Sequence, residues 1–247
     1  MSPLPALPDG WRLEHFTEID GTNAELLRRA GDGEPSGLAI YADIQSAGRG
    51  RRGRSWNSPK GNLCLSVLID APSAIAGQAG FAAALALIDA IEAEVGTGIA
   101  DLRCKWPNDL LLDDAKVAGL LLEAVPNRDQ VVIGMGVNLV PVDVADAVYP
   151  VGTLTAYKIE PAALASQVCD SLALWINSWK TIGFAPLRRA WLERAVGLGE
   201  GITVRLPHDQ LEGIFDDLAD DGALLLNQGA VGVRSISAGD VFFGPEG

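Results

Sequence analysis

The chain has 247 residues, of which 48% are hydrophobic and 21% are charged, and its formal net charge at pH 7 is -13. This length can bury a sizeable core, and a mean hydropathy of +0.19 is typical of a globular protein. The acidic balance argues against general nucleic-acid binding, because the field of the whole protein repels polyanions. The sequence has neither a run of about 18 apolar residues nor an N-terminal secretion signal, so we expect a cytoplasmic protein without membrane attachment.

The cysteines predict neither a disulfide framework nor a zinc site. Cys64, Cys104 and Cys169 are odd in number, far apart and without paired spacing. We expect them to pack in the core, and we predict no metal site built from protein side chains.

The N-terminal part predicts a strand and a short helix. Apolar residues alternate over residues 11–16, as in a strand. Thr22 and Glu25 have capping-box spacing, and an apolar stripe follows until Gly31 ends the predicted helix.

The central part predicts strands around a long helix. Residues 38–43 and 63–69 have the composition of buried strands. Residues 78–95 contain no proline and are rich in alanine, leucine and isoleucine, which favours a helix.

A predicted hairpin continues this sheet. Apolar runs at 102–106 and 110–112 flank a turn at 107–109, and strands are expected at 116–123 and 131–137. We therefore predict an α+β fold, with a mixed, largely antiparallel sheet and helices on one of its faces.

Residues 141–150 have no clear period and are expected to form a mobile loop, followed by helical segments at 161–180 and 187–195. After residue 198 the sequence changes to short strands. They are expected at 202–206, 211–216, 223–226 and 232–236. This spacing suggests a small β-barrel, so two domains are predicted, residues 1–198 and residues 199–247.

Four arginines and three glycines stand together at residues 48–54. Guanidinium groups offer planar donors to phosphate or carboxylate, and glycines let a backbone approach a ligand closely. The segment therefore indicates an anion site. Basic glycine-rich runs also bind RNA, and taken alone the segment fits that reading equally.

Further motifs follow this arginine-glycine segment, at residues 55–59, 61–69, 105–109 and 116–119. With them, residues 20–138 resemble the catalytic domain of the biotin protein ligases. The resemblance implies a biotin/lipoate ligase-like catalytic domain followed by an SH3-like β-barrel. Only about twenty residues precede the motifs, so the class without an N-terminal DNA-binding domain is expected.

The resemblance also implies a function. Such a ligase activates biotin with ATP as biotinyl-5′-AMP and transfers it to a lysine of a biotin carboxyl carrier domain of a carboxylase. ATP, biotin and Mg²⁺ are the implied small molecules. A monomer or homodimer without direct DNA binding is expected.

Roles carry over to matching positions of this chain. The implied biotin contacts are Gly21, Thr22, Asn23, Gln45, Arg49, Gly50, Arg51 and Lys105. The implied nucleotide contacts are Arg51, Arg54, Trp56, Asn108, Lys116 and Asn138. The implied catalytic residues are Arg51, Lys105, Lys116 and Asp109, because adenylation brings a carboxylate against a triphosphate and needs cations around the reacting centre.

Some details stay open at this point. Asp109 has three candidate roles, namely holding Mg²⁺, orienting a lysine and removing a proton, beside a plain turn-forming role. Residues 134–138 do not fit a dinucleotide fingerprint, and the resemblance implies that their glycines make room for ligand. Gly21 replaces a serine frequent in the family, and no tryptophan stands near Thr153 to stack on adenine.

Two other functions compete with this interpretation. A lipoate ligase shares the fold and the adenylation chemistry. An RNA-binding module would use the arginine-glycine segment alone and would leave Lys105, Asn108, Asp109 and Lys116 without a role.

Overall fold

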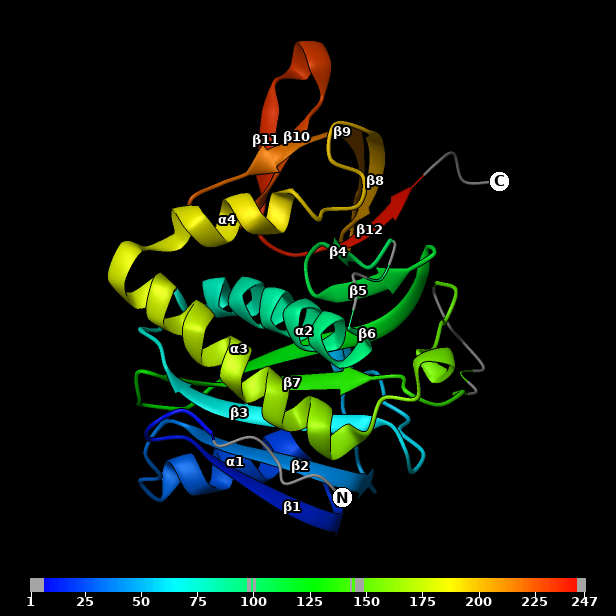
Figure 1. The fold of residues 1–247 in the computed structure, drawn as a ribbon. Helices are drawn as coiled ribbons and strands as arrows, with labels where there is room; N and C mark the ends of the chain where they lie inside the picture. The colour runs from blue at the N-terminus through cyan, green and yellow to red at the C-terminus, as the bar shows by residue number, and fades with distance from the viewer. Residues whose placement is uncertain (1–6, 97–98, 100, 143, 145–148, 244–247) are drawn as a thin grey trace.

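The computed structural model describes residues 7–96, 99, 101–142, 144 and 149–243, and in these residues two β-sheets are joined by four α-helices (Figure 1). The larger sheet has the strand order β1-β2-β3-β7-β6-β5-β4. Its strands are β1 (Arg12–Ile19), β2 (Leu38–Gln45), β3 (Leu63–Asp70), β4 (Arg103–Lys105), β5 (Asp109–Leu112), β6 (Ala115–Ala124) and β7 (Gln130–Val137). The helices are α1 (Thr22–Gly31), α2 (Ala79–Val95), α3 (Pro161–Ile182) and α4 (Phe184–Leu192).

The predicted mixed sheet is confirmed. The pair β1 and β2 is parallel, and the other neighbouring pairs of this sheet are antiparallel. A parallel pair needs a crossover, which α1 supplies between the two strands. The hairpin of β4 and β5 is also confirmed.

The expectation that the helices cover one face of the sheet is wrong. Along β3, Leu65 and Val67 belong to the large core with α2 and α3, whereas Leu68 belongs to a second core with Leu26 of α1. Successive side chains of a strand point to opposite faces, so α1 covers the face opposite α2 and α3. This explains why residues 63–69 are all buried.

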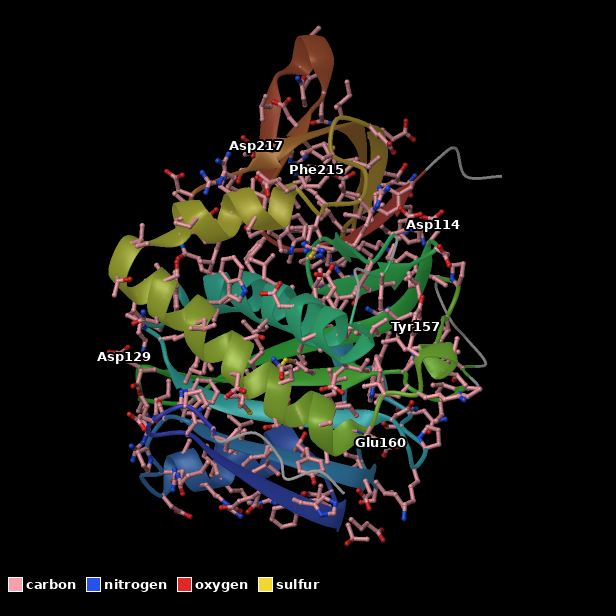
Figure 2. The ribbon with its side chains drawn as sticks, in the orientation of Figure 1. Asp114, Asp129, Tyr157, Glu160, Phe215 and Asp217 are labelled. Atoms are coloured by element: carbon pink, nitrogen blue, oxygen red, sulfur yellow. The ribbon has the colours of Figure 1, made fainter. Side chains whose placement is uncertain are left out.

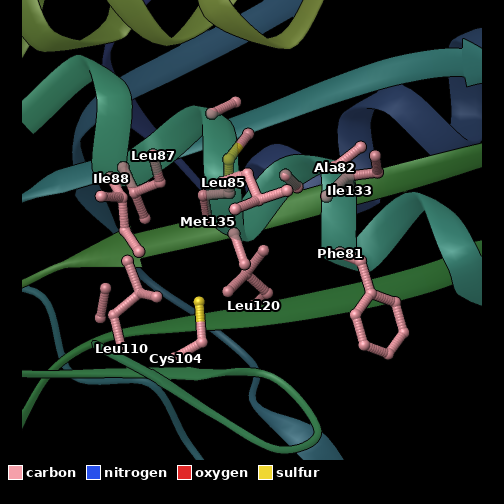
Figure 3. Close-up of a cluster of buried hydrophobic side chains, with 14 of the residues drawn as sticks. Phe81, Ala82, Leu85, Leu87, Ile88, Cys104, Leu110, Leu120, Ile133 and Met135 are labelled. Carbon is pink, nitrogen blue, oxygen red and sulfur yellow. The ribbon is translucent and has the colours of Figure 1, made fainter. Parts of the chain in front are cut away.

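Helix α2 forms the centre of the large core. Phe81, Leu85 and Ile88 of α2 belong to the same cluster of buried side chains as Leu120 and Met135 of the sheet (Figure 3). The stretch Ala76–Val95 is long and apolar enough to cross a membrane by composition, but 67% of its most apolar window is buried inside this fold. It is a core helix here. The three cysteines are free and buried, as predicted.

The smaller sheet has the strand order β11-β10-β9-β8-β12, all antiparallel. Its strands are β8 (Gly201–Arg205), β9 (Gln210–Leu218), β10 (Leu224–Asn227), β11 (Val233–Ile236) and β12 (Asp240–Phe243). The sequence had predicted four of these strands and had missed β12. Among the described strands β11 and β12 are not paired, so closure into a barrel stays a prediction.

The smaller sheet packs on α4. Phe215 of β9, labelled in Figure 2, is 1% exposed and belongs to the large hydrophobic core. Arg188 of α4 donates to the carbonyl oxygen of Leu218 at 2.6 Å and pairs with Asp217. Phe243 of β12 lies near the larger sheet, with its ring centroid 5.7 Å from Nζ of Lys105 on β4. Part of the loop predicted at residues 141–150 lies outside the described residues.

Candidate active site

A cavity of about 510 Å³ opens beside the arginine-glycine segment and the turn at residues 106–109. Its lining includes every residue to which the resemblance assigned a role. They are Gly21, Thr22, Asn23, Gln45, Arg49, Gly50, Arg51, Arg54, Trp56, Lys105, Asn108, Asp109, Lys116 and Asn138. The structure therefore brings together residues that are up to 117 positions apart (138 minus 21).

Glycines of β7 shape the floor of this cavity. A Cβ atom at Gly134 would lie 2.2 Å from Oδ1 of Asn23, and one at Gly136 would lie 2.3 Å from the ring of Trp56. The sequence interpretation had these glycines make room for ligand. In the structure they make room for two side chains that themselves line the cavity.

The start of α1 is held by a network of polar side chains. Gln45 Oε1 accepts from the backbone N of Thr22 at 2.9 Å and from Thr22 Oγ1 at 3.1 Å. Ser66 Oγ lies 2.6 Å from Thr22 Oγ1 and 2.5 Å from Asn23 Oδ1, so its single proton serves one of them at a time.

The predicted capping box of Thr22 and Glu25 is wrong. Gly21 is the N-cap residue, and no side chain caps the helix. Thr22 is 3% exposed, and its hydroxyl faces Gln45 and Ser66 instead of the helix end. The hydroxyl of Thr22 forms these contacts because, when buried next to two polar side chains, it makes more hydrogen bonds with them than it would make at the helix N-terminus.

Lys105 is the most buried cation of the site, with 3% of its surface exposed. Burial lowers the pKa of its ammonium group to about 7, while the charge of Asp109 acts in the opposite direction. Its Nζ lies 2.9 Å from the ring centroid of Tyr149 and 5.7 Å from that of Phe243. The aromatic faces partly replace the water that Lys105 loses on burial.

Arg51 and Lys116 flank the same cavity. Arg51 Nη1 donates to Asn108 Oδ1 at 2.8 Å, and burial lowers the pKa of Arg51. Lys116 Nζ lies 2.7 Å from Asp109 Oδ1 and 5.5 Å from the ring centroid of Trp56. Of the roles considered for Asp109, orienting a lysine is the one with a contact in this structure.

The other three arginines of the segment have protein carboxylates as partners. Arg49 Nη2 lies 3.0 and 3.2 Å from the two carboxylate oxygens of Glu123. Arg52 Nη1 donates to Asp240 Oδ2 at 2.6 Å, and Arg54 Nη2 lies 3.6 Å from Asp240 Oδ1. The segment is thereby attached to both sheets.

The sequence interpretation missed four residues of this region. Ser66 stands in an apolar run, Glu123 near the end of a strand, Tyr149 in a segment without period and Asp240 in the unpredicted strand β12. Only spatial proximity connects them to the site, and no local pattern carried that information. Among the described residues, no group of three or more His, Cys, Asp or Glu side chains is arranged to hold a metal ion.

Comparisons with known proteins extend the likeness over nearly the whole chain. The Biotin/lipoate A/B protein ligase family matches residues 19–138, and the Biotin protein ligase C terminal domain matches residues 197–244. A biotin–acetyl-CoA-carboxylase ligase of Paracoccus denitrificans is 41% identical over 241 residues, covering 93% of this chain and 99% of that protein. One of Mycobacterium tuberculosis is 33% identical, covering 94% and 89%.

The fold is also that of solved structures. A biotin protein ligase from Aquifex aeolicus in complex with biotin and ATP superposes with a TM-score of 0.79 at 24% identity, covering 93% of this chain and 97% of that one. Fold, family models and identity agree with the motifs that line the cavity. This chain belongs to the biotin protein ligase family.

Proposed function

We propose that this protein activates biotin with ATP as biotinyl-5′-AMP and then transfers the biotinyl group to a lysine of a carrier domain. The observation that carries the proposal is the convergence of Lys105, Arg51 and Lys116 on one cavity. The acceptor is the carrier domain of a carboxylase, and the names of the relatives favour acetyl-CoA carboxylase.

Adenylation requires an anion to attack an anion. A carboxylate oxygen of biotin attacks the α-phosphorus of ATP, and pyrophosphate leaves with the electron pair of the broken P–O bond. Cations at fixed positions lower this barrier, and each well-placed electrostatic contact contributes about 3 kcal/mol. We assign Lys105 to binding the carboxylate or the α-phosphate and Lys116 to binding the phosphates. Arg51 is assigned to closing the arginine-glycine segment over the reactants.

Another part of the cavity lining is formed by Gly21, Thr22, Asn23 and Gln45, and there the backbone N of Thr22 donates to Gln45 Oε1. We assign them to the fused rings, with Gln45 at the ureido group. Trp56, Asn108 and Asn138 are assigned to the nucleotide.

In the transfer step the ε-amine of the acceptor lysine attacks the carbonyl carbon of the mixed anhydride. AMP leaves, and the amine loses a proton as the amide forms. The arginine-glycine segment contributes to this step, because in its closed position it keeps water from hydrolysing the anhydride before the lysine attacks.

Mg²⁺ is proposed as an ion carried by the triphosphate. Asp109 and Asp240, the carboxylates among the described residues that line the cavity, are both paired with cations, so this part of the chain offers no acidic cluster there. This donor set fits an ion that keeps phosphate and water ligands. When bound, it neutralises charge on the phosphates.

The test is pyrophosphate release from Mg-ATP with biotin or lipoate supplied separately, first without and then with a carrier domain. Release that depends on biotin, followed by a carrier heavier by one biotinyl group, is the expected result. Release that depends on lipoate would keep the fold and change the substrate. No release with either compound would refute the ligase function.

A further inference from the structure

Glu123 lies where three elements of the site meet. It stands on β6, contacts Asn23 at the start of α1, and contacts Arg49 in the arginine-glycine segment. Asn23 Nδ2 donates to Glu123 Oε2 at 2.8 Å, while Arg49 Nη2 lies 3.0 Å from Oε1. One carboxylate thus holds the wall of the cavity and the segment that borders it.

The contacts continue from Asn23 into the wall assigned to the ring system of biotin. Asn23 Oδ1 lies 2.5 Å from Ser66 Oγ, which lies 2.6 Å from Thr22 Oγ1. Thr22 in turn donates to Gln45. Neighbouring polar groups therefore lead from Gln45 to Arg49 through Glu123, and Ser66 bonds to one of its two neighbours at a time.

Burial separates the two ends of this path. Ser66 is 0% exposed and Asn23 is 9% exposed, so the positions of these side chains are set by the core. The side chain of Glu123 is 22% exposed and that of Arg49 is 52% exposed. The ordered wall can thus fix the carboxylate, and the carboxylate can fix a guanidinium that is otherwise largely in solvent.

Glu123 itself does not belong to the binding surface. Among the described residues, those that line the cavity include Arg49, Asn23 and Gln45 but not Glu123. Any effect of Glu123 on the reaction therefore acts through its two partners.

We propose that Glu123 is a positioning residue that keeps the arginine-glycine segment closed over the cavity by holding Arg49 against the wall formed by Asn23. The proposal rests on the proposed ligase function for its kinetic consequence, but its structural consequence is independent of it. Loss of the contact opens the segment and lets biotin and the adenylate escape.

The test uses Glu123→Gln in the full chain. The amide oxygen can still accept from Asn23, whereas the amide NH₂ is a poor partner for a guanidinium. Trypsin cleavage after Arg51, Arg52 and Arg54 reports opening of the segment, because cleavage of a folded protein follows the open population. We expect cleavage to become up to about fivefold faster, as for the loss of an ion pair whose guanidinium group is largely exposed.

The kinetic readout distinguishes positioning from chemistry. The KM for biotin should rise up to about fivefold in Glu123→Gln, and free adenylate should leak at a similarly higher rate, while kcat for pyrophosphate release changes less than KM. Glu34→Gln is the matched control, since it removes the same charge from the exposed ion pair with Arg12, and it should behave as wild type.

Arg49→Gln breaks the same ion pair without touching Asn23. The proposal requires this variant to share the cleavage and KM changes of Glu123→Gln, and the double variant to be no worse than Arg49→Gln alone. The proposal would be overturned if the effects of Glu123→Gln and Arg49→Gln were additive. It would also be overturned if trypsin cleaved an active Glu123→Gln variant at the wild-type rate. An inactive wild-type protein would instead refute the ligase function, and the cleavage comparison would still decide the role of Glu123.

Discussion

Lys105 shows how burial adjusts a single functional group. Because burial lowers its pKa from 10.5 to about 7, the unfolded chain binds more protons than the folded chain between these pH values. The free energy of unfolding contributed by Lys105 therefore rises with pH across that window and is at its lowest below pH 7. A cation held at this cost indicates a role in binding or catalysis.

We expect Lys105→Met to raise the free energy of unfolding at neutral pH by roughly 1 to 4 kcal/mol, because the replacement removes the cost of burying the ammonium group that lowers the pKa of Lys105. Urea denaturation of both proteins between about pH 6.5 and 8.5 should show this advantage shrinking as the pH rises. Burial raises the pKa of Cys104 and Cys169, but both proteins contain these cysteines, so their contribution cancels in the comparison. A constant advantage would contradict the shifted pKa of Lys105.

Gly134 is a second residue whose role is set by one contact. Gly134→Ala would place Cβ 2.2 Å from Asn23 Oδ1, so Asn23 must move away from Ser66. We expect a loss of about 1 to 3 kcal/mol in unfolding free energy, with weaker biotin binding by calorimetry. Gly31→Ala is the control, since a Cβ there meets nothing within 4 Å. Equal behaviour of the two variants would contradict the role given to Gly134.

At the scale of elements, much of the fold could be predicted because periodicity is local. The alternation of β1 and the long apolar segment of α2 stand in the sequence, and the structure confirms them. Strand partners and sheet faces depend on distant residues, so the face covered by α1 was predicted wrongly. Strand β12 was missed although β10 and β11, which are equally short, were predicted.

The same limit applies to the site. The resemblance rests on several motifs, and the residues of each motif line one part of the cavity. The motifs together therefore predicted cavity residues that no single element would predict. Glu123 and Asp240 escaped because their function lies in salt bridges to arginines 74 and 188 positions away. Such pairs become visible only once the chain is folded.

A further prediction concerns the hairpin of β5 and β6. Lys116 of β6 forms an ion pair with Asp109 of β5, and the register of the two strands shifts between Leu110 and Leu111. We expect Lys116→Ala to lower the rate of pyrophosphate release by about 10²- to 10³-fold, with unchanged biotin affinity. Lys180→Ala, which removes an exposed lysine of α3, is the control. Unchanged release by Lys116→Ala would exclude its role in adenylation.

At the scale of the whole molecule, the smaller sheet is anchored to the rest by contacts of two kinds. Gln78 Nε2 donates to the carbonyl oxygen of Asp220 at 2.8 Å, and Trp106 Nε1 donates to that of Gly222 at 3.1 Å. These bonds are buried or partly buried and hold the turn after β9. Asp240 adds a different kind of contact, because it reaches the arginine-glycine segment itself.

This arrangement places Asp240 and Val241 of the smaller sheet in the lining of the cavity. Asp240 → Asn removes the charge that holds Arg52 and Arg54, but the anchors at Asp220 and Gly222 remain. We therefore expect a stability change of at most about 1 kcal/mol, as for other exposed ion pairs, together with slower adenylation and more rapid escape of the adenylate. Asp209→Asn, which removes a carboxylate paired with Arg234 within the same sheet, should leave both rates unchanged.

Stopped-flow pyrophosphate detection would measure the rate of adenylation by the two variants, and thermal unfolding would measure their stability. If Asp240→Asn lost stability and activity in proportion, the smaller sheet would support the fold alone, whereas loss of activity at full stability would show that it holds the segment in place.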